Sequence, residues 1–169
     1  MFTGAAVLAG LAAISLAAFD DVPVSLGPGF GALRWAATAS TAGLGALLAV
    51  RALATGASVL GRGTGGLFVP LLVMGLIAGH AAGDVFNGNL GLLAMIGAAT
   101  MLGAGYRVPF AALVWVAEST HSVPAVAVAS VAVLIAQSVG GGRSVSTAQR
   151  PLPFGLVAPA PTHRPHPAP

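Results

Sequence analysis

The part of the sequence with the clearest chemistry is residues 63–70, which read GTGGLFVP. Gly63, Gly65 and Gly66 allow a tight turn and keep side chains away from an approaching ligand. Pro70 suits the first turn of a helix, because the N–H that proline lacks would have no intrahelical partner there. The first amides of this helix, from about Gly66 to Phe68, are expected to point into the turn without partners. Together with the helix dipole, such amides form a binding site for an anion.

Two nucleotide-binding interpretations of the same glycines are disfavoured. Gly61, Gly63 and Gly66 match the pattern G-x-G-x-x-G, but a dinucleotide site also needs a preceding strand and an acidic residue about twenty positions later. Asp84 lies near that distance, yet the segment before Gly61 is typical of a membrane helix. A phosphate-binding P-loop is excluded because no Lys-Ser/Thr pair follows. An anion site without a basic side chain suits an ion that must leave as well as arrive.

The remaining titratable residues show no pattern of an enzyme or a metal site. His80 lies on an apolar stretch, where it would either relay a proton or pack with a hydrogen bond, and the packing interpretation is favoured. His163 and His166 form a pair without further ligands, so metal binding is not expected. The sequence shows no nucleophile–base pair and no paired carboxylates of the kind used in hydrolysis, so we expect neither enzymatic activity nor a cofactor.

The composition is that of a membrane protein. Hydrophobic residues make up 56% of the 169 residues and charged residues only 7%, with a mean hydropathy of +0.92. Soluble domains carry roughly a quarter charged residues, so this chain could not cover a water-exposed surface. The net charge of +3 comes with no basic stripe, which argues against nucleic-acid binding. The absence of cysteine excludes disulfides and thiol chemistry.

The sequence predicts an all-α membrane protein of tilted and broken transmembrane helices. Several apolar stretches are shorter than the roughly 20 residues that cross a bilayer. Broken helices expose backbone amides, which survive at membrane depth only inside protein or beside a cavity, as in transporters. Gly75, Gly79 and Gly83 are spaced by four and predict close helix packing. The apolar stretches are residues 2–19, 35–50, 52–60, 67–82, 90–106, 109–117 and 125–139.

The two ends of the chain differ in character. Residues 2–19 are interpreted as a membrane helix rather than a secretory signal, because no Lys or Arg precedes Arg34. The abrupt start suggests that the chain begins partway through a larger fold. The chain is divided into a transmembrane domain, 1–149, and a proline-rich tail, 150–169, that is expected to be disordered. Arginines gather near this end of the chain, so the positive-inside rule predicts that the C-terminus lies in the cytoplasm. The expected membrane is a bacterial-type plasma membrane.

Residues 65–70 resemble the G-x-F-x-P signature of the CLC family of chloride channels and transporters. Other segments resemble the same family in order and spacing: residues 27–31, residues 106–110 leading into 114–120, and residues 143–145 ahead of Gln149. The resemblance covers residues 27–149. It implies a dimer in which each subunit has its own pore built from two inverted halves, and the chain resembles the second half.

The resemblance also implies particular site residues. In the CLC family the amides of the x-F pair coordinate a central chloride, which corresponds to Leu67 and Phe68 beside Gly66. A tyrosine hydroxyl near the last membrane helix also binds that ion, and the matching position here is Ser146. Serine keeps the hydroxyl donor but has a shorter reach.

The family's first half has no counterpart in the sequence. Its serine-containing anion loop and its gating glutamate in a G-x-E-x-P segment are both absent, while Glu118 matches a second-half position near the dimer interface and is interpreted as structural. The expected partners are chloride or a similar anion, membrane lipid, and either a second copy or a chain that supplies the first half. Two functions stay open: anion transport within such an assembly, or a truncated, non-transporting remnant or accessory subunit.

Overall fold

The computed structural model describes residues 2–20, 22–27, 29–60, 66–141 and 144–145. Within these residues every regular element is an α-helix, which confirms the prediction of an all-α chain. The predicted tail, 150–169, lies outside the described residues. The helices are α1 (Phe2–Ala18), α2 (Phe30–Ala36), α3 (Thr41–Leu60), α4 (Phe68–Val85), α5 (Leu90–Tyr106), α6 (Pro109–Thr120) and α7 (Val123–Val139).

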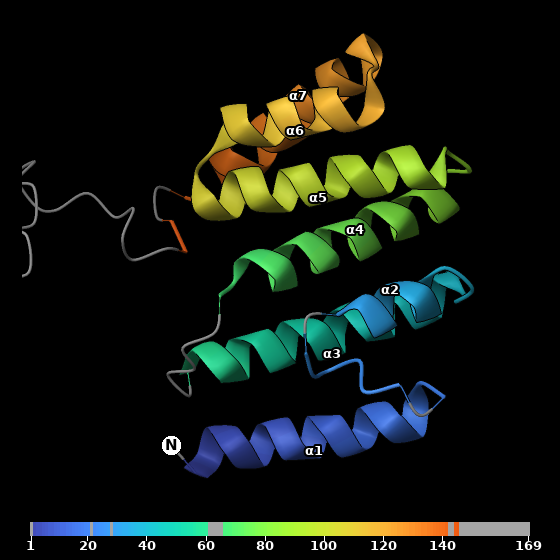
Figure 1. Cartoon of the computed structure of the whole chain (residues 1–169), viewed down its shortest axis with the longest axis vertical. Helices are drawn as coiled ribbons and strands as arrows, with labels where there is room; N and C mark the ends of the chain where they lie inside the picture. The colour runs from blue at the N-terminus through green and yellow to red at the C-terminus, as the bar shows by residue number, and fades with distance from the viewer. Residues whose placement is uncertain (1, 21, 28, 61–65, 142–143, 146–169) are drawn as a thin grey trace, which may run out of the picture.

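The helices form a stack in which α1 lies at one edge and α6 and α7 lie at the other (Figure 1). Helix α3 packs against α1 and α4, and α5 packs against α4, α6 and α7. The short helix α2 lies against both α3 and α4. The beginning of α4 is therefore placed by the helices on both sides of it.

Helix α3 differs from the prediction in where it begins and how far it runs. The apolar stretch predicted at 35–50 is interrupted at residues 37–40, where the Thr38 hydroxyl donates to the Trp35 carbonyl and the Ser40 hydroxyl accepts the N–H of Gly43 at 3.3 Å. Serine and threonine compete for backbone groups in this way at helix ends. The break predicted at Arg51 is absent, because α3 continues through it to Leu60.

The close packing predicted for the glycines of α4 is confirmed. A Cβ atom on Gly75 would lie 2.6 Å from the Cα atom of Ala98, and one on Gly79 would overlap the Leu93 carbonyl. Gly97 of α5 has an equally close approach to α4. Since lipid offers little hydrophobic drive for helix association, backbone contact of this kind supplies the packing. It holds α4 firmly against α5.

The helix ends carry side-chain caps at two turns. The Asn89 side chain accepts the N–H of Leu92 at 3.0 Å and starts α5. The Ser122 hydroxyl accepts the N–H of Ala125 at 3.4 Å, and Pro124 falls in the first turn of α7. Both caps satisfy amides that have no intrahelical partner.

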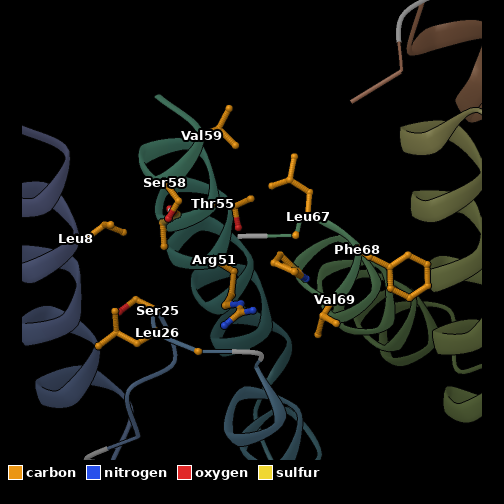
Figure 2. A pocket seen from close by; sticks show the side chains of 14 residues that line it. Leu8, Ser25, Leu26, Arg51, Thr55, Ser58, Val59, Leu67, Phe68 and Val69 are labelled. Carbon is orange, nitrogen blue, oxygen red and sulfur yellow. The ribbon is translucent and has the colours of Figure 1, made fainter. Parts of the chain in front are cut away.

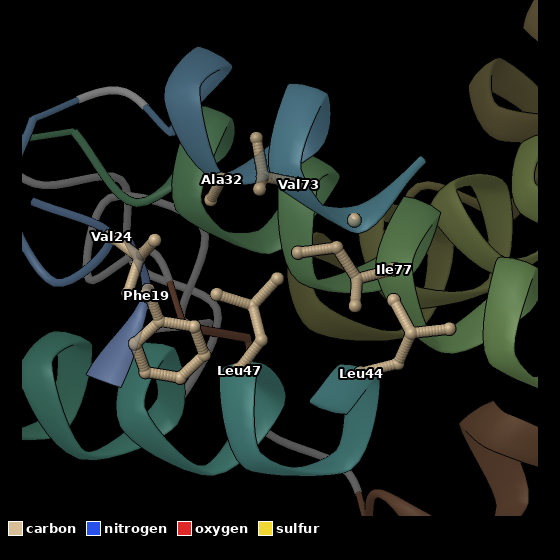
Figure 3. Close-up of a cluster of buried hydrophobic side chains, with 8 residues drawn as sticks. Phe19, Val24, Ala32, Leu44, Leu47, Val73 and Ile77 are labelled. Atoms are coloured by element: carbon tan, nitrogen blue, oxygen red, sulfur yellow. The ribbon is translucent and has the colours of Figure 1, made fainter. Parts of the chain in front are cut away.

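Two buried clusters join the helices. One of them brings Phe19, Leu47 and Val73 together, and Figure 3 shows these side chains converging from separate segments of the chain. The second joins α5, α6 and α7 through small residues such as Ala99 and Ala129, which are fully buried. The first cluster packs α4 against α2 and α3, and so fixes the beginning of α4 from one side.

Large apolar side chains remain on the outside of the described molecule. Phe110 and Val139 are both 82% exposed, and Leu134 on α7 is 63% exposed. By length and composition, α3 and α4 are long and apolar enough to cross a membrane. These surfaces are what a bilayer or another apolar chain would cover.

Candidate functional site

Helix α4 begins at Phe68, as the glycine and proline pattern predicted. Leu67 is its N-cap residue, with φ −84° and ψ −7°, and its carbonyl accepts the N–H of Leu71 at 3.1 Å. Pro70 lies in the first turn, where its missing N–H removes no intrahelical bond. Gly66 precedes the cap and is exposed, and the predicted turn residues Gly63 and Gly65 lie outside the described residues.

The first amides of α4 are available to a ligand. Helix geometry leaves the opening N–H groups without intrahelical acceptors. Among the described residues, no acceptor receives a hydrogen bond from the amides of Leu67, Phe68 or Val69. The N-terminal end of the helix dipole lies at the same place and favours negative charge.

The residues that carry these amides line a cavity of about 730 Å³. Its walls come from α1, from residues 25–27, from the second half of α3 and from the beginning of α4 (Figure 2). Leu67, Phe68 and Pro70 all line it, together with Gly66. The structure thus brings four of the predicted site residues to one side of a single cavity.

Arg51 also lines this cavity, and the sequence analysis did not identify it as a site residue. Its side chain is only 2% exposed, and its Nη1 atom donates to the Val24 carbonyl at 2.9 Å. Gly29, with φ 99°, closes over the guanidinium so tightly that a Cβ there would lie 2.6 Å from Nη2. The sequence signal was the charge itself, since an arginine within a membrane helix is costly and usually has a function.

The Phe68 ring also lies near the last residue of α5, Tyr106. The Phe68 and Tyr106 rings lie 6.1 Å apart between centroids. Near this tyrosine, the Ser144 hydroxyl donates to the Tyr106 carbonyl at 3.4 Å, and the Val145 N–H donates to the Gly105 carbonyl at 2.9 Å. The predicted hydroxyl donor, Ser146, lies outside the described residues, but the segment leading to it is anchored beside Tyr106.

The other candidates lie away from this cavity. His80 faces a smaller apolar cavity of about 250 Å³ beside Leu33 and Ile77, with no hydrogen bond from its imidazole to a described residue. Glu118 is exposed on α6 and pairs with no described residue. Asp84 accepts a hydrogen bond from the Thr41 hydroxyl. No cluster of metal-binding side chains occurs in the described parts of the chain.

The geometry is that of a helix N-terminus at the edge of a cavity, inside a bundle of apolar helices. The profile of the family described as voltage gated chloride channel matches residues 2–141. The chain belongs to the voltage-gated chloride channel family. Members of this CLC family are integral membrane proteins that act as channels or transporters rather than enzymes. Comparisons with curated proteins and with solved structures gave no significant match.

The family match confirms the resemblance to the CLC family, and it extends further toward the N-terminus than the motifs do; the motif at residues 143–149 lies outside the matched residues. The motifs began at residue 27, whereas the family match also includes α1. The first helix is therefore part of the CLC membrane domain.

Proposed function

We propose that the chain takes part in moving chloride or a similar anion across a membrane, within a CLC-type channel or transporter. The anion is held by the amides of Leu67 and Phe68 at the beginning of α4. The observation that carries the proposal is the position of these amides, which lack acceptors among the described residues and belong to residues that line the 730 Å³ cavity. Family membership gives the class of ion.

The physical argument is one of desolvation. An anion that leaves water for a low-dielectric interior loses its hydration, and fixed amide donors replace part of it. Amide dipoles bind an ion less strongly than a cation in direct contact with it would, so the ion is stabilised but can still leave. No covalent step is involved.

The proposal also includes a partner. CLC proteins work as dimers, and by resemblance each of their pores is built from two inverted halves. Because the chain resembles the second half, we propose that a separate chain supplies the first half or that a second copy takes its place. Ser146 is proposed as a hydroxyl donor from the segment that follows Val145.

The test is chloride efflux from liposomes that hold the purified chain, alone and together with a chain that carries the first-half motifs. Phe68→Pro removes one amide donor, whereas Phe68→Leu removes the ring and keeps the amide. Phe68→Pro is expected to reduce chloride efflux about tenfold or more, because a hydrogen bond to a charged group is lost. Phe68→Leu is expected to change it much less.

Two results would contradict the proposal. If efflux persists unchanged in Phe68→Pro while circular dichroism shows intact helices, the amide assignment is wrong. If neither the chain alone nor the combined chains release chloride, the chain is a non-transporting relative, and the transport function is wrong.

A further inference from the structure

A row of polar side chains runs along one face of α3, an otherwise apolar helix. Arg51, Thr55 and Ser58 are spaced by four and three residues, which places them on the same helical face. All three line the 730 Å³ cavity opposite the beginning of α4. Figure 2 shows Thr55 on the side of α3 that faces Leu67. Polar groups on one face of a membrane helix are expensive unless they serve a ligand or a partner.

Of these three residues, Arg51 is the one that carries a charge. Arg51 is only 2% exposed, and its Nη1 atom donates a hydrogen bond to the Val24 carbonyl. An arginine keeps its charge in almost any protein environment. In a low-dielectric wall that charge acts over a longer range than in water, so it raises the positive potential of the whole cavity.

The two hydroxyls differ in what they already do. The Ser58 hydroxyl donates to the Ala54 carbonyl at 2.9 Å, within its own helix. The Thr55 hydroxyl makes no hydrogen bond to a described residue, and its side chain is only partly covered. Thr55 is therefore the hydroxyl of α3 that has a donor to offer across the cavity.

We propose that α3 forms the second wall of the anion site, in which the Arg51 guanidinium supplies positive charge and the Thr55 hydroxyl donates a hydrogen bond to the ion. The inference rests on the proposed function, since it assigns further binding residues to the same site. The ligand is a small inorganic anion held between the amides of α4 and the polar face of α3.

The experiment measures chloride binding without requiring transport. The full chain is unfolded by heat in detergent or nanodiscs while chloride replaces isethionate at constant ionic strength. A ligand that binds the folded state raises the unfolding temperature with its concentration, which gives an apparent Kd. The variants are Arg51→Gln, Arg51→Lys and Thr55→Val. Two controls lie outside the cavity: Arg34→Gln on α2 and Thr100→Val on α5.

Arg51→Gln is expected to raise the chloride Kd about tenfold or more, because a charge beside the ion is lost in a low-dielectric wall. Arg51→Lys keeps the charge and is expected to stay within about threefold of the native Kd, and Thr55→Val is expected to raise it about threefold. Arg34→Gln and Thr100→Val are expected to leave it within about twofold.

The outcomes separate this inference from the proposed function. If Phe68→Pro abolishes the chloride effect while Arg51→Gln and Thr55→Val leave it unchanged, the α4 site stands and the α3 wall is wrong. If the native chain shows no chloride effect either alone or together with a chain that carries the first-half motifs, both are wrong. If Arg51→Lys weakens chloride as much as Arg51→Gln, Arg51 acts by packing, and the assignment of charge is overturned. If Arg51→Gln does not fold, Arg51→Lys and Thr55→Val decide between these results.

Discussion

Gly79 is one of the glycines at which α4 packs against the backbone of α5. A Cβ atom at this position would overlap the backbone carbonyl of Leu93, which cannot swing away as a side chain can. Gly79→Ala is therefore expected to force the helices apart and to lower the free energy of unfolding by about 1–3 kcal/mol. Thermal unfolding in detergent measures the change.

The matched control is Gly56→Ala on α3, where a new Cβ would meet nothing within 4 Å. Alanine is a better helix former than glycine, so this variant is expected to be neutral or more stable by up to about 1 kcal/mol. Equal losses in the two variants would show that helix propensity, rather than the contact with α5, governs the effect.

At the residue scale, the sequence predicted a helix that begins near Leu67 and Phe68, but it did not identify Arg51 as a residue beside that helix start. The amides follow from local chemistry, because glycines and a proline at fixed spacing determine where a helix begins. Arg51 interrupts an apolar run in the sequence, and a single charged residue in such a run is easily interpreted as a helix boundary. Only the fold shows that α3 continues and that the Val24 carbonyl and Gly29 surround the guanidinium.

Asn89 stabilises the beginning of a helix, because its side chain caps the first turn of α5. Asn89→Ala leaves the Leu92 amide without this acceptor and is expected to cost about 1 kcal/mol of stability. Asn89→Asp keeps an acceptor oxygen and is expected to stay near the native value. The measurement is thermal unfolding of the three proteins side by side.

If Asn89→Asp is as unstable as Asn89→Ala, the Asn89 side chain does not stabilise α5 by accepting the N–H of Leu92. The turn before α5 would then depend on another feature, such as Asn87, which has φ 51° in the left-handed region. Asparagine tolerates that region better than most residues.

At the element scale, most of the long apolar helices were predicted, but α3 was wrong at two points: its start was missed, and a break was predicted at Arg51. Helices α5 and α7 lie where glycine, asparagine and proline mark their ends. The turn between α2 and α3 was missed because it contains neither glycine nor proline, and is closed instead by hydroxyls of Thr38 and Ser40. Such hydroxyls also occur inside membrane helices, where they bond to their own backbone, as Thr100 does with Ile96.

For the whole molecule, the arginines near the C-terminus predict only on which side of the membrane the tail lies. Arg143, Arg150 and Arg164 gather near the C-terminus, which the positive-inside rule places in the cytoplasm. Because the chain has no cysteine, Pro169→Cys creates a single labelling site. A membrane-impermeant maleimide added to intact cells is expected to leave this cysteine unmodified, and a permeant maleimide is expected to label it.

Labelling by the impermeant reagent on intact cells would reverse the proposed orientation. The same cysteine in detergent-solubilised membranes is the control for reactivity. The sequence predicts this orientation only from charge, since no contact in the described residues fixes which side of the bilayer each helix end faces.

The central claim is that an anion lies against the main-chain amides at the beginning of α4. Crystals grown with bromide in place of chloride test it most directly, because the bromide ion is located by its anomalous scattering. We expect an anomalous peak within hydrogen-bonding distance of the Leu67 and Phe68 nitrogen atoms, inside the cavity that Arg51 also lines. Bromide bound elsewhere in the protein, with this cavity empty of it, would contradict the claim.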